Sequence, residues 1–275
     1  MKIAYQGIEG SYSESCAKEI HPNSKTIPCK TFDDVFKMAN EDEEVMAIIP
    51  ESNRTTGNIG VEYLIFKYRL NIYKEKFYPI NHCLLGALGS KVENIKNVYS
   101  HAQALSQSSE FIKKNNLNEN VRADTAGSAK YVSEIKDKSK AAISSSLSAK
   151  IYGLDILSKN IQDDENNITR FLVMGKEIYQ PEFKDENYIT SFLFKLKSKP
   201  AALYSALSGF AINGVNMIKL QSFFEKNSFE SVFFLCDIEG HIEDKKIKIS
   251  LEELGLHCED MHVLGVYNSD KFRQK

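Results

Sequence analysis

The chain has 275 residues, of which 42% are hydrophobic and 26% charged, which is enough for one large globular domain or two unequal ones. Its 35 basic and 37 acidic residues give a formal net charge of -2, which excludes the strongly basic surface typical of proteins that bind nucleic acid or an anionic membrane. No apolar run approaches the roughly 18 residues that a membrane-spanning helix needs, and five dispersed cysteines predict a reduced, cytoplasmic protein.

As far as Met174 the chain alternates short apolar runs with amphipathic stretches, which is typical of an α/β domain with a largely parallel or mixed sheet. The predicted strands are Lys2–Tyr5, Val45–Ile49, Lys76–Leu88, Asn97–Ser100, Val121–Asp124, Ala141–Ser144 and Thr169–Met174. The predicted helices are Ser13–Ile20, Phe32–Ala39, Gly57–Tyr68, Ala102–Asn115, Ala126–Ile135 and Leu147–Tyr152. We expect two lobes that face each other across a cleft, because segment 70–90 has the pattern of a connection that crosses between them.

A polar segment, residues 176–187, contains Pro181 and shows no clear period, so we predict a linker there. The chain beyond it has the strand and helix order β-α-β-β-α-β of a ferredoxin-like fold. The predicted elements are Tyr188–Lys197, a helix from Pro200 to about Ile212, Val215–Phe224, Ser228–Ile238, a helix at Asp244–Leu254, and His262–Tyr267.

Small polar residues follow nearly every predicted strand of the large domain, at the point where the next helix begins. They lie in Gly7–Glu14, Asn53–Gly57, Ser100–Gln103, Asp124–Gly127 and Ser144–Ser146. In open α/β sheets ligands bind beyond the carboxyl ends of the strands, and the N-termini of helices favour anions. These loops therefore predict a cleft for a small ligand with carboxylate groups; the alternative is that their Ser and Thr residues only cap helices.

Cofactor and metal motifs are not found in the sequence. The glycines Gly7 and Gly10 do not form the dinucleotide-binding pattern G-x-G-x-x-G, and no Walker A lysine pattern occurs. The six histidines are dispersed, and the cluster of His257, Cys258 and His262 lacks the usual zinc spacing. We expect neither a cofactor nor a metal.

Five segments of the first domain resemble, in order, the motifs of prephenate dehydratases. They are Tyr5–Glu14 (YQGIEGSYSE), Ser100–Gln107 (SHAQALSQ), Asp124–Ala129 (DTAGSA), Ala141–Ser145 with Ile151–Leu154 and Ile161–Asp163, and Asn167–Phe171 (NITRF). The Thr169-Arg170-Phe171 triplet matches the hallmark of this family. The C-terminal module resembles an ACT domain, the amino-acid-sensing unit of the family, at Pro200–Leu203, Gly214–Asn216 and Asp237–His241.

The resemblance implies a periplasmic-binding-protein-like, two-lobed catalytic domain at residues 1–178 and an ACT regulatory domain at residues 188–275. The family converts prephenate to phenylpyruvate with loss of carbon dioxide and water, in L-phenylalanine biosynthesis, without a cofactor. Arogenate, which has an amine where prephenate has a ketone, is an alternative substrate. The resemblance also implies a homodimer or homotetramer, with L-phenylalanine as effector.

The family motifs also assign the site residues. The predicted catalytic residues are Thr169, as donor to the departing hydroxyl, Arg170, as carboxylate ligand, and Gln103 and Asn53. The predicted substrate-binding residues are Ser11, Ser13, Thr125, Ser144 and Phe171, and the predicted allosteric residues are Ala202, Leu203, Asn216 and Ser222.

Two departures from the family pattern leave a second interpretation, that the protein is a sensor and not an enzyme. Ser52 and Arg54 stand where the family has glutamate and serine, which changes the local charge by about two units in a site for a dianion; Glu51 could replace the lost carboxylate. The ACT motif Glu-Ser-Arg-Pro reads Gln221–Phe224, and its glycine is Ala201. These changes predict weak turnover or altered effector binding, so a catalytically weak carboxylate or amino-acid sensor is the alternative to an enzyme.

Overall fold

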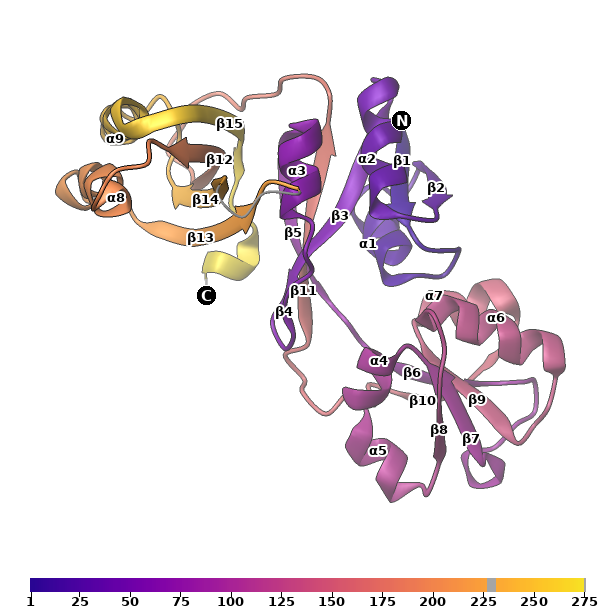
Figure 1. Ribbon diagram of the computed structural model, residues 1–275. Helices are drawn as coiled ribbons and strands as arrows, with labels where there is room; N and C mark the ends of the chain where they lie inside the picture. The colour runs from indigo at the N-terminus through magenta and orange to yellow at the C-terminus, as the bar shows by residue number, and fades with distance from the viewer. Residues whose placement is uncertain (227–230, 275) are drawn as a thin grey trace. The chain divides into compact units, whose positions relative to one another are not determined.

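The computed structural model describes residues 1–226 and 231–274 (Figure 1), and the described chain divides into two compact units. The first unit comprises Met1–Val35, Ile48–Ile59 and Phe77–Phe171, and the second Phe36–Ala47, Gly60–Lys76 and Leu172–Lys275. Within the described residues, no helix combines the length and the apolar composition that crossing a membrane requires.

The first sheet has the strand order β2-β1-β3-β11-β5, and β4 also pairs with β3. Its strands are β1 (Lys2–Gln6), β2 (Lys25–Cys29), β3 (Val45–Asn53), β4 (Gly57–Asn58), β5 (Asn71–Pro79) and β11 (Ile168–Gly175). The helices along this part of the chain are α1 (Tyr12–Ile20), α2 (Phe32–Glu41) and α3 (Glu62–Tyr68). The helix α2 begins with a capping box, because Thr31 and Asp34 each donate a backbone N–H to the other's side chain.

The second sheet has the order β10-β6-β9-β7-β8 and mixes parallel and antiparallel pairs. Its strands are β6 (Cys83–Gly86), β7 (Asn97–Ser100), β8 (Asn118–Val121), β9 (Lys140–Ser144) and β10 (Asp155–Lys159). A 3-10 turn, η1 (Val92–Asn94), precedes β7, and the helices are α4 (Ala102–Ser106), α5 (Ser109–Lys114), α6 (Thr125–Ile135) and α7 (Ser146–Tyr152).

Both faces of the second sheet are buried. Leu84 packs in one hydrophobic cluster with residues of α4 and α5, whereas its neighbour Leu85 packs in another with residues of α6 and α7. Side chains alternate between the two faces of a strand, so strands covered by helices on both sides must be apolar throughout. This burial explains why the central strands β6 and β9 are readable as short continuous apolar runs, whereas the edge strand β8 is polar and mostly exposed.

In the second unit, β12 (Tyr188–Leu196), α8 (Ala202–Ile212), β13 (Met217–Phe224), β14 (Val232–Glu239), α9 (Lys245–His257) and β15 (Cys258–Asn268) follow in chain order, and the turn η2 (Lys271–Gln274) ends the described chain. The strands form an antiparallel sheet in the order β13-β14-β12-β15. Residues of α8 and α9 pack with residues of this sheet in a single apolar cluster. Figure 1 shows the helices α8 and α9 beside the strands of this sheet. The element order is the predicted β-α-β-β-α-β, although residues 228–230 of the predicted third strand lie outside the described residues.

Several predicted boundaries were wrong. The strand predicted at 76–88 is two strands, β5 and β6, and the helix predicted at 102–115 is two helices, α4 and α5. The helix predicted from Gly57 begins only at Glu62, because Gly57 and Gly60 adopt positive φ values of 80° and 87°. The strand predicted at Val121–Asp124 is β8, which ends at Val121. The strands β2, β4 and β10 were not predicted; β2 and β10 lie at the edge of a sheet, and β2 contains Pro28, which is tolerated at an edge.

Candidate active site

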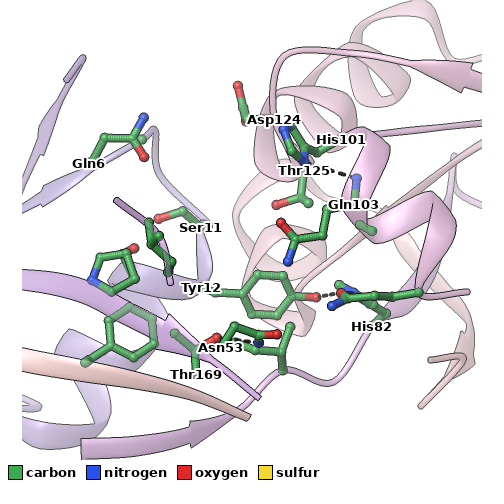
Figure 2. Close-up of a pocket in the computed structure, with 18 of the residues that line it drawn as sticks. Gln6, Ser11, Tyr12, Asn53, His82, His101, Gln103, Asp124, Thr125 and Thr169 are labelled. Carbon is green, nitrogen blue, oxygen red and sulfur yellow. Dashed lines mark hydrogen bonds between the residues drawn. The ribbon is translucent and has the colours of Figure 1, made fainter. Parts of the chain in front are cut away.

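A cavity of about 380 Å³ lies in the first unit and is lined from both of its sheets. The turn after β1 and the start of α1 contribute Gly7, Ser11 and Ser13, whereas the starts of α4 and α6 contribute Gln103 and Thr125. Figure 2 shows Ser11, Gln103 and Thr125 around the same cavity as Tyr12, His82, Asn53 and Thr169. Four of the five predicted polar loops thus meet at the cavity, whereas no residue of the fifth, Ser144–Ser146, lines it.

The glycine turn before α1, residues 7–10, is held in place by the backbone conformation of Gly10 and by two serines, Ser145 and Ser148. Gly10 has φ 90°, and a side-chain carbon there would collide with Ser148. The hydroxyls of Ser145 and Ser148 both donate to the Gly10 carbonyl oxygen, at 2.6 and 2.9 Å. The turn places Ser11 as N-cap of α1, where its hydroxyl oxygen accepts from the Glu14 N–H.

Successive side chains of strand β11 point to opposite faces of the first sheet. Thr169 and Phe171 line the cavity, and Arg170 between them does not. Instead, Arg170 Nη1 lies 3.3 Å from Glu51 Oε2, in an ion pair whose side chains are only 5% and 1% exposed. This alternation follows from strand geometry, and it gives no support to the expected contact between Arg170 and a substrate carboxylate.

Asn53 connects β3 to Thr169. Its amide nitrogen donates to Thr169 Oγ1 at 2.9 Å, and its amide oxygen accepts the backbone N–H groups of Thr55 and Thr56 at 3.0 and 3.2 Å. Because the Thr169 oxygen accepts this bond, the hydroxyl hydrogen is directed elsewhere, and among the described residues none accepts it. The Thr169 hydroxyl is therefore a hydrogen-bond donor available to a ligand in the cavity.

A tyrosine and a histidine that sequence analysis overlooked share the cavity wall. Tyr12 Oη lies 2.7 Å from His82 Nδ1 (Figure 2). Burial raises the pKa of Tyr12 well above its ordinary value, with further contributions from Cys83 and Tyr78. Burial also lowers the pKa of His82, against an opposing hydrogen bond from Gln107, so both groups are neutral at pH 7.

The charges of the lining are few. Among the described residues that line the cavity there is no lysine or arginine, and Asp124 is its carboxylate. The side chain of Asp124 caps α6 by accepting the Gly127 N–H. Arg54 and Glu51 are not among the lining residues, so neither departure in the Asn53 loop adds a charge to the cavity wall.

Most of the predicted site residues are brought together, and the exceptions have physical reasons. Seven line the cavity: Thr169, Gln103, Asn53, Ser11, Ser13, Thr125 and Phe171. Ser144 does not, because its hydroxyl is fully buried and donates to Ser148 Oγ behind the glycine turn. The polar lining residues that were not predicted as site residues are Gln6, Tyr12, His82, His101, Gln107 and Asp124. Of these, Gln107 has a local signal, since it lies four residues after Gln103, at helical spacing.

The four residues predicted as allosteric lie in the second unit. Ala202 and Leu203 line a cavity of about 720 Å³ at the start of α8. Asn216 donates to Glu239 Oε2 at 2.8 Å, and Ser222 lies on the edge strand β13.

Comparison with known proteins gives consistent matches. Residues 3–179 match the family model of prephenate dehydratase. The chain is 34% identical to a bifunctional N-acyl-homoserine lactone acylase/prephenate dehydratase of Komagataeibacter europaeus, over 99% of this chain and 98% of the relative. It is 36% identical to arogenate dehydratase 2 of Petunia hybrida, over 98% of this chain and 72% of the relative.

Solved structures agree with these matches. A protein described as a novel type of quorum quenching acylase superposes with a TM-score of 0.92 at 34% identity, covering 99% of this chain and all of the other. A prephenate dehydratase of Arthrobacter aurescens, solved in complex with L-Phe, has a TM-score of 0.88 at 24% identity, with 98% and 90% covered; at this identity the likeness concerns the fold alone.

Proposed function

Because the chain belongs to the prephenate dehydratase family, we infer that the cavity of the first unit carries out the reaction of that family, the decarboxylative dehydration of prephenate to phenylpyruvate. The chain is accordingly a carbon–oxygen lyase of L-phenylalanine biosynthesis. In this reaction the bond from the ring to its carboxylate breaks, its electron pair makes the ring aromatic, and the C4–oxygen bond releases hydroxide. One proton taken up from solvent turns that hydroxide into water, so the dianion yields a monoanion, carbon dioxide and water.

The main structural support for this reaction is the orientation of the Thr169 hydroxyl. Its oxygen accepts from Asn53, and its hydrogen is available to the cavity. A hydroxyl is too weak an acid to protonate the leaving group outright, so Thr169 stabilises the charge that develops on the departing oxygen. A preorganised donor of this kind contributes roughly 10²–10³ in rate.

The carboxylates of the substrate are held by neutral groups and by a helix end. Since the described lining has no lysine or arginine, the partial positive charge at the N-terminus of α1 supplies the attraction, whereas the N-terminus of α6 is already capped by the Asp124 carboxylate. The hydroxyls of Ser11, Ser13 and Thr125 and the amide of Gln103 donate hydrogen bonds, and Phe171 packs against the ring. Arg170 acts through the fold, by neutralising the buried Glu51.

Arogenate is the second candidate substrate, and the lining favours it in one respect. Asp124 is a carboxylate with no cation beside it in the lining, and the ammonium group of arogenate reduces the substrate's net charge from two negative units to one. The relative from Petunia hybrida is named an arogenate dehydratase. Both substrates require the same Thr169 chemistry.

The experiment is a steady-state assay of the purified protein with each substrate, alongside Thr169→Val and Thr169→Ser. Valine has the shape of threonine without the hydroxyl, so we expect kcat to fall about 10²–10³-fold, whereas serine keeps the donor and should retain most of the activity. Equal rates for Thr169→Val and the parent would show that this hydroxyl is not the donor. Binding of either acid without turnover would instead identify a sensor.

For residues 188–275 we propose an ACT regulatory domain that binds L-phenylalanine, and for residues 1–178 the catalytic domain. Support comes from the family match to residues 3–179, the ferredoxin-like strand order, and the cavity beside Ala202 and Leu203. The five cysteines are free and buried, which agrees with a cytoplasmic enzyme. Repeating the assay with phenylalanine and measuring the mass in solution would test the effector and the proposed dimer or tetramer.

A further inference from the structure

Four side chains, two of which line the cavity, form a closed ring of hydrogen bonds. Each donates to the next: Asn53 Nδ2 to Asn167 Oδ1 at 2.9 Å, Asn167 Nδ2 to Gln107 Oε1 at 3.0 Å, Gln107 Nε2 to Thr55 Oγ1 at 2.7 Å, and Thr55 Oγ1 to Asn53 Oδ1 at 2.7 Å. All four belong to the first unit. Hydrogen bonds that run in one direction polarise and strengthen one another.

The direction of the ring is fixed from outside. Backbone N–H groups can only donate, and those of Thr55 and Thr56 both point at the same atom of the Asn53 amide, which must therefore be its oxygen. The Asn53 nitrogen then has to donate to Asn167, and this leaves the Asn167 nitrogen as the donor to Gln107. The orientation of every amide in the ring follows from these two backbone groups.

The ring in turn fixes the tautomer of His82. Gln107 Oε1, which accepts from Asn167, also lies 3.0 Å from His82 Nε2. An amide oxygen only accepts, so His82 Nε2 carries the hydrogen. Since burial keeps the imidazole neutral, His82 Nδ1 is a bare acceptor.

The hydrogen of the Tyr12 hydroxyl is consequently directed at the protein. Tyr12 Oη is 2.7 Å from His82 Nδ1 and 3.2 Å from the carbonyl oxygen of Asn81, and both of these are acceptors. Figure 2 shows the hydroxyl of Tyr12 turned towards His82. Whichever acceptor takes the hydrogen, the phenol oxygen presents only lone pairs to the cavity that Tyr12 lines.

We propose that Tyr12 is a substrate-binding residue that accepts a hydrogen bond from the substrate, held in this role by His82 and by the ring of Asn53, Asn167, Gln107 and Thr55. The cavity then has a hydroxyl donor, Thr169, and a hydroxyl acceptor, Tyr12, whose opposite polarities are set by one connected network. This assignment rests on the function proposed above, because it supposes that the substrate occupies this cavity.

The two candidate substrates offer different donors to such an acceptor. Prephenate, with both carboxylates ionised, has a single hydrogen on oxygen, at the C4 hydroxyl. Arogenate has the same hydroxyl and also an ammonium group. Hydrogen bonds to charged groups contribute more than neutral ones, so the two sources give different losses when the acceptor is removed.

The experiment compares Tyr12→Phe with the parent on both substrates. If Tyr12 accepts from the C4 hydroxyl, kcat/KM should fall about 3–10-fold for prephenate and for arogenate alike. If it accepts from the ammonium group, kcat/KM should fall about 10–100-fold for arogenate and stay unchanged for prephenate. Tyr131→Phe is the matched control, since Tyr131 packs on Tyr99 away from the lining and should leave both rates unchanged.

The tautomer of His82 provides a test that does not depend on catalysis. In ¹⁵N-histidine-labelled protein at pH 7.5, NMR should show His82 protonated at Nε2 and bare at Nδ1. An Nδ1-protonated tautomer, an imidazolium, or Tyr12→Phe rates within twofold of the parent on both substrates would overturn the proposal. A parent protein without turnover would refute the proposed function, whereas the NMR result would still decide the direction of the network.

Discussion

Replacing Arg170 separates a structural role from a substrate-binding role. Arg170 Nη1 lies 3.3 Å from Glu51 Oε2, and the exposed fractions of the two side chains are 5% and 1%. Arg170→Met preserves the length and apolar character of the side chain but leaves the Glu51 carboxylate without this cation. The substituted residue still points away from the cavity, so we expect the change to affect stability and not substrate binding.

The size of the effect follows from burial. Removing one partner of a buried ion pair costs about 3–5 kcal/mol, because the other charge stays in a region of low polarity. At roughly 2–4 °C per kcal/mol for a chain of this size, Tm should fall by about 6–20 °C. The double variant Glu51→Gln/Arg170→Met removes both charges, and we expect it to recover much of this loss.

Two measurements on the same samples decide the matter. Thermal unfolding gives Tm, and steady-state kinetics well below the transition gives kcat and KM for prephenate. We expect a lower Tm with KM within about twofold of the parent, since the contacts between the cavity lining and the substrate are unchanged. An unchanged Tm together with a KM raised more than tenfold would show that the guanidinium binds the substrate, and would refute the reasoning from strand alternation.

The remaining predictions concern pH and packing. Burial holds the pKa of His82 below its ordinary 6.5, so the unfolded chain binds more protons than the native one as pH falls below about 6.5, and the free energy of unfolding should decrease there. His82→Asn should reduce this loss between pH 7.5 and 5.5 in urea unfolding; an identical pH slope would contradict the assignment. In the second unit, a side-chain carbon at Gly265 would collide with the backbone carbonyl of Ile72, so Gly265→Ala should lower the free energy of unfolding by about 1–3 kcal/mol. Gly255→Ala, whose new carbon would find Met261 at 3.9 Å, is the control and should not destabilise; equal stability of the two variants would contradict the packing argument.

The elements that could be predicted are those with a strong local signal. The strand β7 was predicted with its observed bounds, and α1, α2, α6 and α7 to within two residues at each end. Their apolar periodicity and their capping residues are properties of neighbouring positions. Errors occur where tertiary contacts outweigh the local pattern, as in the edge strand β2, or where the chain breaks a continuous pattern, as between α4 and α5.

The site residues, like the elements, divide into those that a local pattern predicts and those whose position depends on the folded structure. Ser11, Ser13 and Thr125 could be found because each follows a strand and opens a helix, and Thr169 because it belongs to a family motif. Arg170 shares that motif, yet the strand period of two places it on the opposite side from Thr169. A motif identifies neighbouring residues as a set, whereas the strand geometry decides which of them reach the ligand.

The alternation of strands and helices, the polar loops at the strand ends, and the family could all be read from the amino-acid sequence, because these depend on residues close together in the chain. Which hydroxyl donates a hydrogen bond and which accepts one, in contrast, depends on the fold. Asn53 meets Thr169 across 116 residues of chain, and Tyr12 meets His82 across 70. The direction of a hydrogen bond depends on the partner at its other end, and folding alone brings such distant partners together.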